Sequence, residues 1–455
     1  MTLQGFRGEI LSLSHDPAEA PDPVRHAADG LLVVEAGRVV ARGAFAEVAP
    51  RFPWLAVEQL PGLIVPGFID AHVHYPQLGR IASNGEQLLD WLERHIFPAE
   101  KAFADPVHAA RVAEDFLGEL LRHGTTSALV FGTVHAASVE AFFAAAEARD
   151  LRMICGKVLM DLGPEGLRDT VEEARDESAA LIAKWHGRAR LGYAVTPSYA
   201  LTSSDEQLAL AGDILAAHPG VLLHTHLAEN KAEIAAVAAR FTEAVDYLDA
   251  YDRFGLVTDR SVFAHGVHLP DRSCTRLAET GAGIAVCPSS NFFLGSGMFD
   301  FAQAERHGVR LGLGSDIGAG TSLSLLHNGG LAYQAGLPGG YVLDPFRALW
   351  LATGGSARLL HIDHEVGMLA EGQEADFVVL DDAATPLMAR RTAAASLAER
   401  LFALQVLGDD RAVRRTYVMG RCVWDRDGTD GHALRLHPAA AQGRAASPHL
   451  GEPRA

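Results

Sequence analysis

The chain has 455 residues, of which 48% are hydrophobic and 21% are charged. This composition is typical of globular proteins and excludes a wholly disordered chain. The 39 basic and 57 acidic residues give a formal net charge of −18. That balance argues against a general nucleic-acid or anionic-membrane binder, because both need a basic face. The length allows about two to four domains, or one large barrel with an appendage.

The cysteines and the N-terminal segment indicate the compartment. The four cysteines, at positions 155, 274, 287 and 422, include no CxxC pair. Neither a disulfide framework nor a cysteine-rich zinc site is therefore indicated, and a reducing compartment is the simpler interpretation. The first residues carry no apolar signal segment, and no stretch reaches the roughly 18 apolar residues of a membrane span. We expect a cytoplasmic protein that does not span a membrane.

Both ends of the chain contain short β segments. Two β-branched runs flank Glu35-Ala36-Gly37, which is a hairpin signal, and residues 374–380 and 415–424 have similar composition. Such small pieces cannot each bury a core alone. We therefore predict one flanking β-sandwich domain, built from residues 1–66 and 376–426. Residues 427–455 are rich in Gly, Ala, Pro and Arg without periodicity, which predicts a disordered tail.

The centre of the chain alternates between apolar runs and helical patterns. This alternation predicts a (β/α)8 barrel over residues 67–375. A doubly wound open sheet is the competing fold, but no glycine-rich phosphate loop follows the first run. The eight candidate strands lie at residues 63–74, 126–133, 152–161, 190–199, 221–229, 261–268, 281–290 and 309–318.

Two histidine pairs stand near the ends of candidate strands. His72 and His74 are two residues apart on the first strand, so their side chains point the same way. His224 and His226 repeat this spacing on the fifth strand, where His226 lies nearer the end. Barrel enzymes build their sites at this end of the strands. The two pairs are therefore candidate metal ligands.

Three further residues complete a possible metal centre. His265 closes the sixth strand, with His268 as a competitor, and Asp316 closes the eighth. Three histidines and a carboxylate suit zinc and tolerate iron, and such a metal lowers the pKa of bound water to about 7. Glu229 follows the fifth strand, where it can carry protons or begin the helix from Asn230. Both roles are compatible.

Longer motifs resemble a known family. PGFIDAHVHYPQ, HTHLAENKAE, FAHGVHL and GLGSDIGAG resemble the amidohydrolase superfamily. GEQLLDWLERHIFPAE, LRHGTTSALVFGTVH, GKVLMD, CPSSNFFLGSG and LGDDRAVRRTYVMGR are similar to its guanine deaminase branch. The resemblance runs from about residue 5 to residue 425.

The resemblance implies a set of roles. The metal, one zinc ion per chain with iron as the alternative, would be bound by His72, His74, His226 and Asp316. His265, Glu229 and Asp316 would be catalytic, with Glu229 as the proton shuttle and His265 bonded to the hydroxide or the intermediate. The implied activity is hydrolytic deamination of guanine to xanthine and ammonia, in a homodimer.

The resemblance also implies how the ring is bound. Gln77 would bond the purine edge, and Leu88 and Trp91 would form an apolar wall. The remaining residues implied to contact the ring are His74, Ser198, Tyr199, His226, Glu229 and Asp316.

One position departs from the family pattern. The family has Thr-Pro-Arg-Phe after the fourth strand, where the arginine binds the purine carbonyl edge, whereas this chain has Thr196-Pro197-Ser198-Tyr199. Two interpretations stay open. Either the pocket takes a differently substituted ring, such as 8-oxoguanine, another oxopurine or a pterin, or an arginine from elsewhere compensates.

The sequence supports two other function classes less well. A dinuclear cyclic amide hydrolase resembles this barrel but uses a bridging lysine, usually from the fourth strand. That strand has no lysine here, and Lys157 is on the third. A non-enzymatic relative would generally have lost its ligands, and all of the candidate ligands are present.

Overall fold

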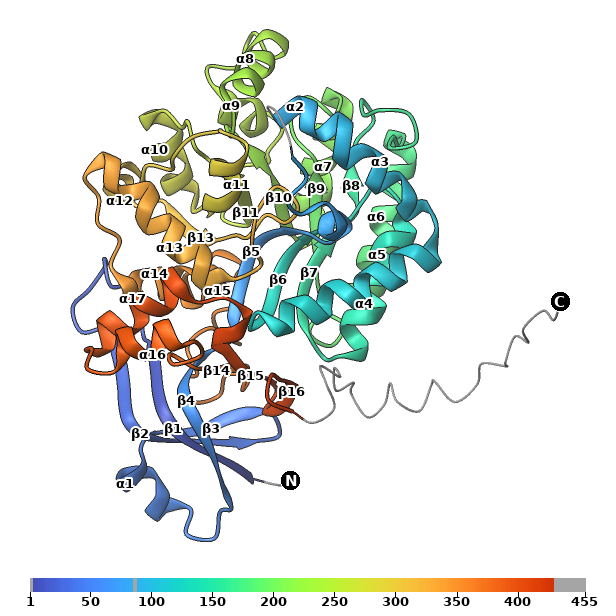
Figure 1. Ribbon diagram of the computed structural model, residues 1–455. Helices are drawn as coiled ribbons and strands as arrows, with labels where there is room; N and C mark the ends of the chain where they lie inside the picture. Colours follow the sequence, from blue (N-terminus) through green and yellow to red (C-terminus); the bar gives the residue numbers. More distant parts are fainter. Residues whose placement is uncertain (1–2, 85–87, 429–455) are drawn as a thin grey trace, which may run out of the picture.

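The computed structural model describes residues 3–84 and 88–428 (Figure 1). Most of the predicted tail, residues 429–455, lies outside the described residues, as do the first three residues of the GEQLLDWL motif. Within the described part, no helix has both the length and the apolar character that a membrane crossing requires.

Eight parallel strands form the central barrel, as predicted. The ring closes through backbone bonds in which Asp316 N–H donates to His72 and His74 N–H donates to Ile317. The junction between the first and last barrel strands, here called the seam, therefore lies beside the predicted metal ligands His72, His74 and Asp316. The barrel strands are β5 (Phe68–His74), β6 (Thr125–Phe131), β7 (Arg152–Gly156), β9 (Gly192–Pro197), β10 (Leu222–Leu227), β11 (Ser261–His265), β12 (Gly283–Val286) and β13 (Arg310–Leu313), and β8 (Val158–Leu159) pairs with β9.

Helices surround this barrel (Figure 1). Several begin at side-chain caps: Thr170 and Glu173 form a capping box before α6, and Asp105 accepts a bond from Val107 N–H at the start of α4. The helices of this region are α2 (Leu88–Trp91), α3 (Phe97–Glu100), α4 (Pro106–Arg122), α5 (Ala136–Ala148), α6 (Val171–Trp185), α7 (Asp205–Ala217), α8 (Lys231–Arg240), α9 (Tyr247–Asp252), α10 (Asp271–Thr280), α11 (Pro288–Phe293), α12 (Phe301–His307), α13 (Leu325–Gly336), α14 (Pro345–Leu351) and α15 (Gly354–Leu359).

An irregularity in β5 sets the direction of the first histidine pair. Ile69 and Ala71 pack in an apolar cluster with residues of the other barrel strands, whereas Val73 packs in the larger cluster shared with the helices. The register against β6 shifts between Asp70 and Val73. Such a bulge re-aims the side chains that follow it.

Seven strands from both chain ends form the expected flanking β domain as one mixed sheet (Figure 1). The predicted hairpin is present: Ala36 and Gly37 join β2 to β3, and both have the positive φ that a type I′ turn requires. Along the sheet the strands are β16 (Arg421–Asp425), β15 (Val413–Val418), β14 (Phe377–Leu380), β4 (Val57–Pro66), β1 (Leu3–Leu13), β2 (Val24–Glu35) and β3 (Arg38–Ala44). α1 (Phe45–Val48) follows β3, and α16 (Pro386–Thr392) and α17 (Leu397–Leu407) lie between β14 and β15 in the chain, with α17 packed against α13 and α14.

A buried ion cluster ties the barrel to the segment that enters β14. Arg190 Nη2 lies 2.6 Å from Glu374 Oε2 and 2.5 Å from Asp376 Oδ2. Arg152 Nε adds a 2.8 Å bond to the same Glu374 oxygen. All three members of the Arg190 group are buried.

Replacing Arg190 with Leu is expected to lower the free energy of unfolding by roughly 3–5 kcal/mol, because two buried carboxylates lose their shared cation. Urea unfolding at pH 7 measures the change. The control is Arg188→Leu, which breaks an exposed pair with Glu147 and should cost about 1 kcal/mol or less. If both substitutions lowered the free energy of unfolding equally, the stabilising role of the buried Arg190 cluster would be wrong.

Candidate active site

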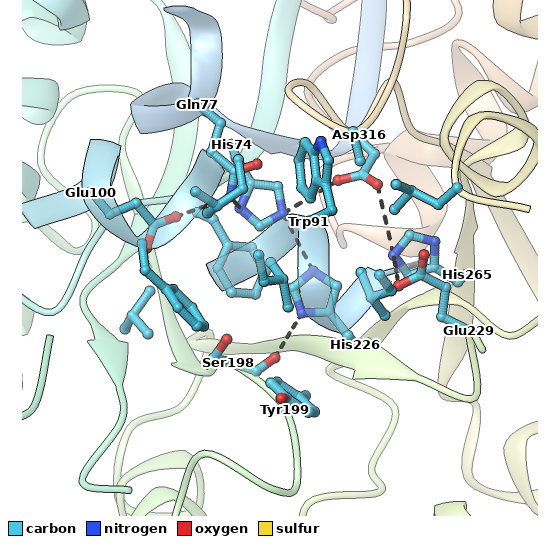
Figure 2. A pocket seen from close by; sticks show the side chains of 18 of the residues that line it. His74, Gln77, Trp91, Glu100, Ser198, Tyr199, His226, Glu229, His265 and Asp316 are labelled. Atoms are coloured by element: carbon cyan, nitrogen blue, oxygen red, sulfur yellow. Dashed lines mark hydrogen bonds and ion pairs between the residues drawn. The ribbon is translucent and has the colours of Figure 1, made fainter. Parts of the chain in front are cut away.

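A pocket opens where the barrel strands end (Figure 2). Its volume, open mouth included, is about 690 Å³, which is in the range of small-molecule sites. His72 is fully buried and does not line the pocket. The other predicted site residues do line it: His74, Gln77, Leu88, Trp91, Ser198, Tyr199, His226, Glu229, His265 and Asp316.

The four predicted metal ligands converge on one point. His74 Nε2 lies 3.2 Å from His72 Nε2 and 3.3 Å from His226 Nε2. Asp316 Oδ1 lies 3.1 Å from His72 Nε2 and 3.3 Å from His74 Nε2. Histidine and carboxylate ligands of zinc lie about 2.0–2.2 Å from the ion, so donor atoms roughly 3–3.5 Å apart can share one ion. The donor set and its spacing therefore fit this ion.

Neighbouring groups aim two of these imidazoles. His226 Nδ1–H donates to the carbonyl of Ser198 at 2.7 Å, and His72 Nδ1 bonds His224 Nε2 at 2.7 Å. Each bond leaves Nε2 facing the convergence point, which is the usual way that a second layer orients metal-binding histidines. His224, itself a candidate ligand from the sequence, instead bonds His72 and orients that candidate ligand.

Burial keeps these rings neutral. It lowers the pKa of His72 to about 4, and it lowers the pKa values of His224 and His226 well below their usual range. Neutral imidazole is the form that binds a metal ion.

Glu229 and His265 stand on one side of the ligand cluster (Figure 2). Ser296 Oγ donates to Glu229 Oε1 at 3.0 Å, and Glu229 Oε2 lies 3.5 Å from His265 Nε2. His265 Nδ1–H donates to Asn291 Oδ1 at 2.9 Å, which turns Nε2 toward Glu229 and Asp316. Both side chains are held at the edge of the pocket.

The environment shifts the pKa of both groups. Burial raises the pKa of Glu229 to about 7, against the opposing effect of His265. Burial alone would lower the pKa of His265, but the carboxylates of Glu229 and Asp316 raise it above its usual value. A carboxyl group in this range can both give and take a proton near neutrality.

Three strand ends leave the extended conformation through non-glycine residues with positive φ. These are Ala228 at 49°, His265 at 72° and Asp316 at 50°. Such conformations cost free energy and persist where the surrounding structure holds them, often at functional sites. They turn the chain sharply at the rim of the pocket.

A buried carboxylate holds the backbone of Glu229. Glu233 Oε2 accepts bonds from the N–H groups of Glu229 and Asn230, each at 3.1 Å. Its Oε1 accepts a 2.6 Å bond from Tyr247 Oη. Glu233 is therefore a candidate positioning residue for Glu229.

Glu233→Ala is expected to lower kcat about tenfold or more with metal content unchanged, because two buried N–H groups and one hydroxyl lose their acceptor. Glu233→Gln keeps an amide oxygen in place as an acceptor, so its kcat should fall less than that of the Ala variant. Steady-state kinetics and metal analysis of both variants provide the test. An Ala variant as active as the wild type would contradict the positioning role.

The ring-binding side of the pocket is apolar with a few polar groups. Trp91 packs with its neighbours in an apolar cluster, and its Nε1–H donates to the carbonyl of Ser83 at 3.2 Å. Gln77 Nε2 donates to Glu100 Oε1 at 2.9 Å, and Gln77 Oε1 accepts from Gly318 N–H at 3.2 Å. Burial raises the pKa of Tyr199 to about 12, so its hydroxyl stays neutral.

No lysine or arginine is found among the described residues that line the pocket. Residues 85–87, which the structure does not describe, are Gly, Glu and Gln. Lys157 is fully buried elsewhere, with Nζ 2.6 Å from Asp169 and 3.3 Å from Glu177. The described structure thus offers neither a compensating arginine nor a bridging lysine.

Four residues near the site were not assigned roles from the sequence. Glu100 belongs to the FPAE motif, and Asn291 and Ser296 belong to the CPSSNFFLGSG motif. Glu233 belongs to the HTHLAENKAE motif. The motifs marked these segments, but only the folded chain shows what the side chains contact.

Comparison with known proteins agrees with this geometry. The amidohydrolase family profile matches residues 63–423. Guanine deaminase of Escherichia coli (strain K12) is 44% identical over 433 residues, which cover 94% of this chain and 99% of that protein.

Two solved structures have the same fold. The E. coli guanine deaminase structure superposes with a TM-score of 0.90 at 42% identity, covering 94% of this chain and all of that one. A guanine deaminase from C. acetobutylicum with bound guanine gives a TM-score of 0.85 at 26% identity, covering 92% and 100%. The chain therefore belongs to the amidohydrolase family, in the branch whose members are named guanine deaminases.

Proposed function

We propose that this protein hydrolyses guanine to xanthine and ammonia. The main observation in support is that the candidate metal ligands lie together beside Glu229 and His265 in one pocket. These ligands are His72, His74, His226 and Asp316. The near full-length similarity to the E. coli guanine deaminase supports the choice of substrate.

We propose zinc as the metal, one ion per chain, held by His72, His74, His226 and Asp316, with iron as the alternative. When bound, the ion supplies positive charge that lowers the pKa of water, so a strong nucleophile is available at neutral pH. The donor types and the spacing of 3.1–3.3 Å support this assignment.

The protein's own groups then move the protons. Asp316 accepts a proton from the attacking water, and Glu229 protonates the ring nitrogen beside the carbon that carries the amine. His265 donates a hydrogen bond from Nε2 to the oxygen on which charge develops. Glu229, now a carboxylate, next takes the remaining proton of the added hydroxyl and passes it to the amine, so the carbon–nitrogen bond breaks and ammonia leaves. The proton held by Asp316 returns Glu229 to its acid form, and guanine plus water has become xanthine plus ammonia.

The remaining predicted residues position the ring. Leu88 and Trp91 form the apolar wall, and Gln77, held by Glu100, faces the ring edge. Ser198 and Tyr199 line the pocket where the family pattern has arginine and phenylalanine.

Ammonia release from metal-replete protein tests the proposal. The panel contains guanine, 8-oxoguanine, isoguanine, adenine, a pterin and uric acid. Guanine should lead with kcat/KM of about 10⁴ M⁻¹s⁻¹ or more, an ordinary enzyme efficiency. If another ring leads and guanine is poor, guanine is not the substrate.

Three further assignments are proposals from the sequence: a homodimer, a cytoplasmic location, and a catalytic barrel bounded at residues 67 and 375. Sedimentation of the purified protein tests the first. A mass of one chain would contradict it.

A further inference from the structure

The polar side chains of the ring-binding side differ in how freely they can form new hydrogen bonds. Gln77, Ser198 and Tyr199 line the pocket away from Glu229 and His265 (Figure 2). The Gln77 amide is held at both ends, by Glu100 and by the N–H of Gly318, whereas the hydroxyls of Ser198 and Tyr199 can each donate or accept. Glu100, next to Gln77, adds a carboxylate.

Charged donor-only side chains are missing from this side, in the part of the chain that the structure describes. No lysine or arginine is among the described residues that line the pocket. The indole N–H of Trp91 already donates to the carbonyl of Ser83. The tyrosine hydroxyl stays protonated, since burial raises the pKa of Tyr199 to about 12.

This composition bears on specificity. A site rejects a ligand strongly when binding leaves a fixed buried donor facing another donor, because that group then has no partner. A hydroxyl, such as that of Ser198 or Tyr199, can rotate and accept instead. Such a site therefore imposes a small penalty when a ring carbonyl is replaced by an amino group.

We propose that the pocket binds 6-oxopurines and 6-aminopurines with similar affinity, so that its selectivity rests on the reacting amidine and on shape rather than on the carbonyl edge. This rests on the proposed function for the identity of the ring. It predicts that 6-amino rings act as ligands of the same pocket.

The test compares hypoxanthine and adenine, which differ only along this edge and are both uncharged at pH 7. Isothermal titration calorimetry with the zinc-loaded protein measures both dissociation constants without depending on turnover. The expected ratio of the two constants is tenfold or less. A preference for hypoxanthine above tenfold overturns the inference, and so does a failure to bind either ring.

Two variants locate the cause. Ser198→Arg introduces a donor-only group, and it should shift the ratio toward hypoxanthine by roughly ten- to a hundredfold. Tyr199→Phe removes a hydroxyl that can either donate or accept. It should weaken the binding of hypoxanthine and of adenine by a similar factor. A Ser198→Arg variant that binds ligand with an unchanged ratio would contradict the argument from donor-only groups.

The proposed function can fail separately. If both rings bind equally and guanine is not deaminated, the inference stands and the proposed reaction is wrong. If guanine is deaminated and hypoxanthine binds far better than adenine, only the inference is wrong.

Discussion

Glu229→Gln is expected to lower kcat by about 10²–10⁴-fold, the range for loss of a general acid–base group. The amide keeps the size of the side chain and can still accept the bond from Ser296, so fold and metal content should not change. Steady-state kinetics, thermal melting and metal analysis of the purified variant provide the measurement.

Glu233→Gln is the matched control for this substitution. It removes a charge from the same helix start, but Glu233 contacts backbone N–H groups and Tyr247 rather than reacting atoms. If both variants lose the same activity, the loss reflects the local structure, and the shuttle role of Glu229 is wrong.

Removal of the metal with a chelator is expected to lower activity by more than about a hundredfold, and one equivalent of zinc should restore it. Reloading should also raise the melting temperature, because a ligand held only by the folded state stabilises it by about 4 kcal/mol at a thousand times its dissociation constant. Calorimetry with added zinc measures this directly.

The number of ions distinguishes the two hydrolase classes. One ion per chain is expected from the cluster of His72, His74, His226 and Asp316. Full activity only with two ions per chain would favour the dinuclear hydrolase and contradict the proposed mechanism. The position of Lys157, paired with Asp169 away from the pocket, already disfavours that class.

Local patterns predicted the barrel and its strand-end histidines. Each of the eight apolar runs overlaps a barrel strand, and the two-residue spacing of His72 and His74 does bring their rings together. This works because strand alternation and strand-end convergence are local or repeated features. The bulge that re-aims β5 leaves no such signature.

The supporting residues depend on contacts between distant segments. Ser296 reaches Glu229 from 67 positions away, and Glu100 meets Gln77 from a separate helix. Neither periodicity nor spacing encodes such pairings. That no lysine or arginine is among the described residues lining the ring-binding side likewise becomes visible only when these side chains are assembled.

The seam of the barrel has a consequence for biosynthesis. His72 and Asp316, which meet where the ring closes, are 244 positions apart in the chain. At about 5–20 residues per second, a ribosome needs roughly 10–50 s to travel between them. The nascent chain therefore exposes its first histidine pair long before the last ligand exists, and a complete ion-binding centre can form only late in synthesis.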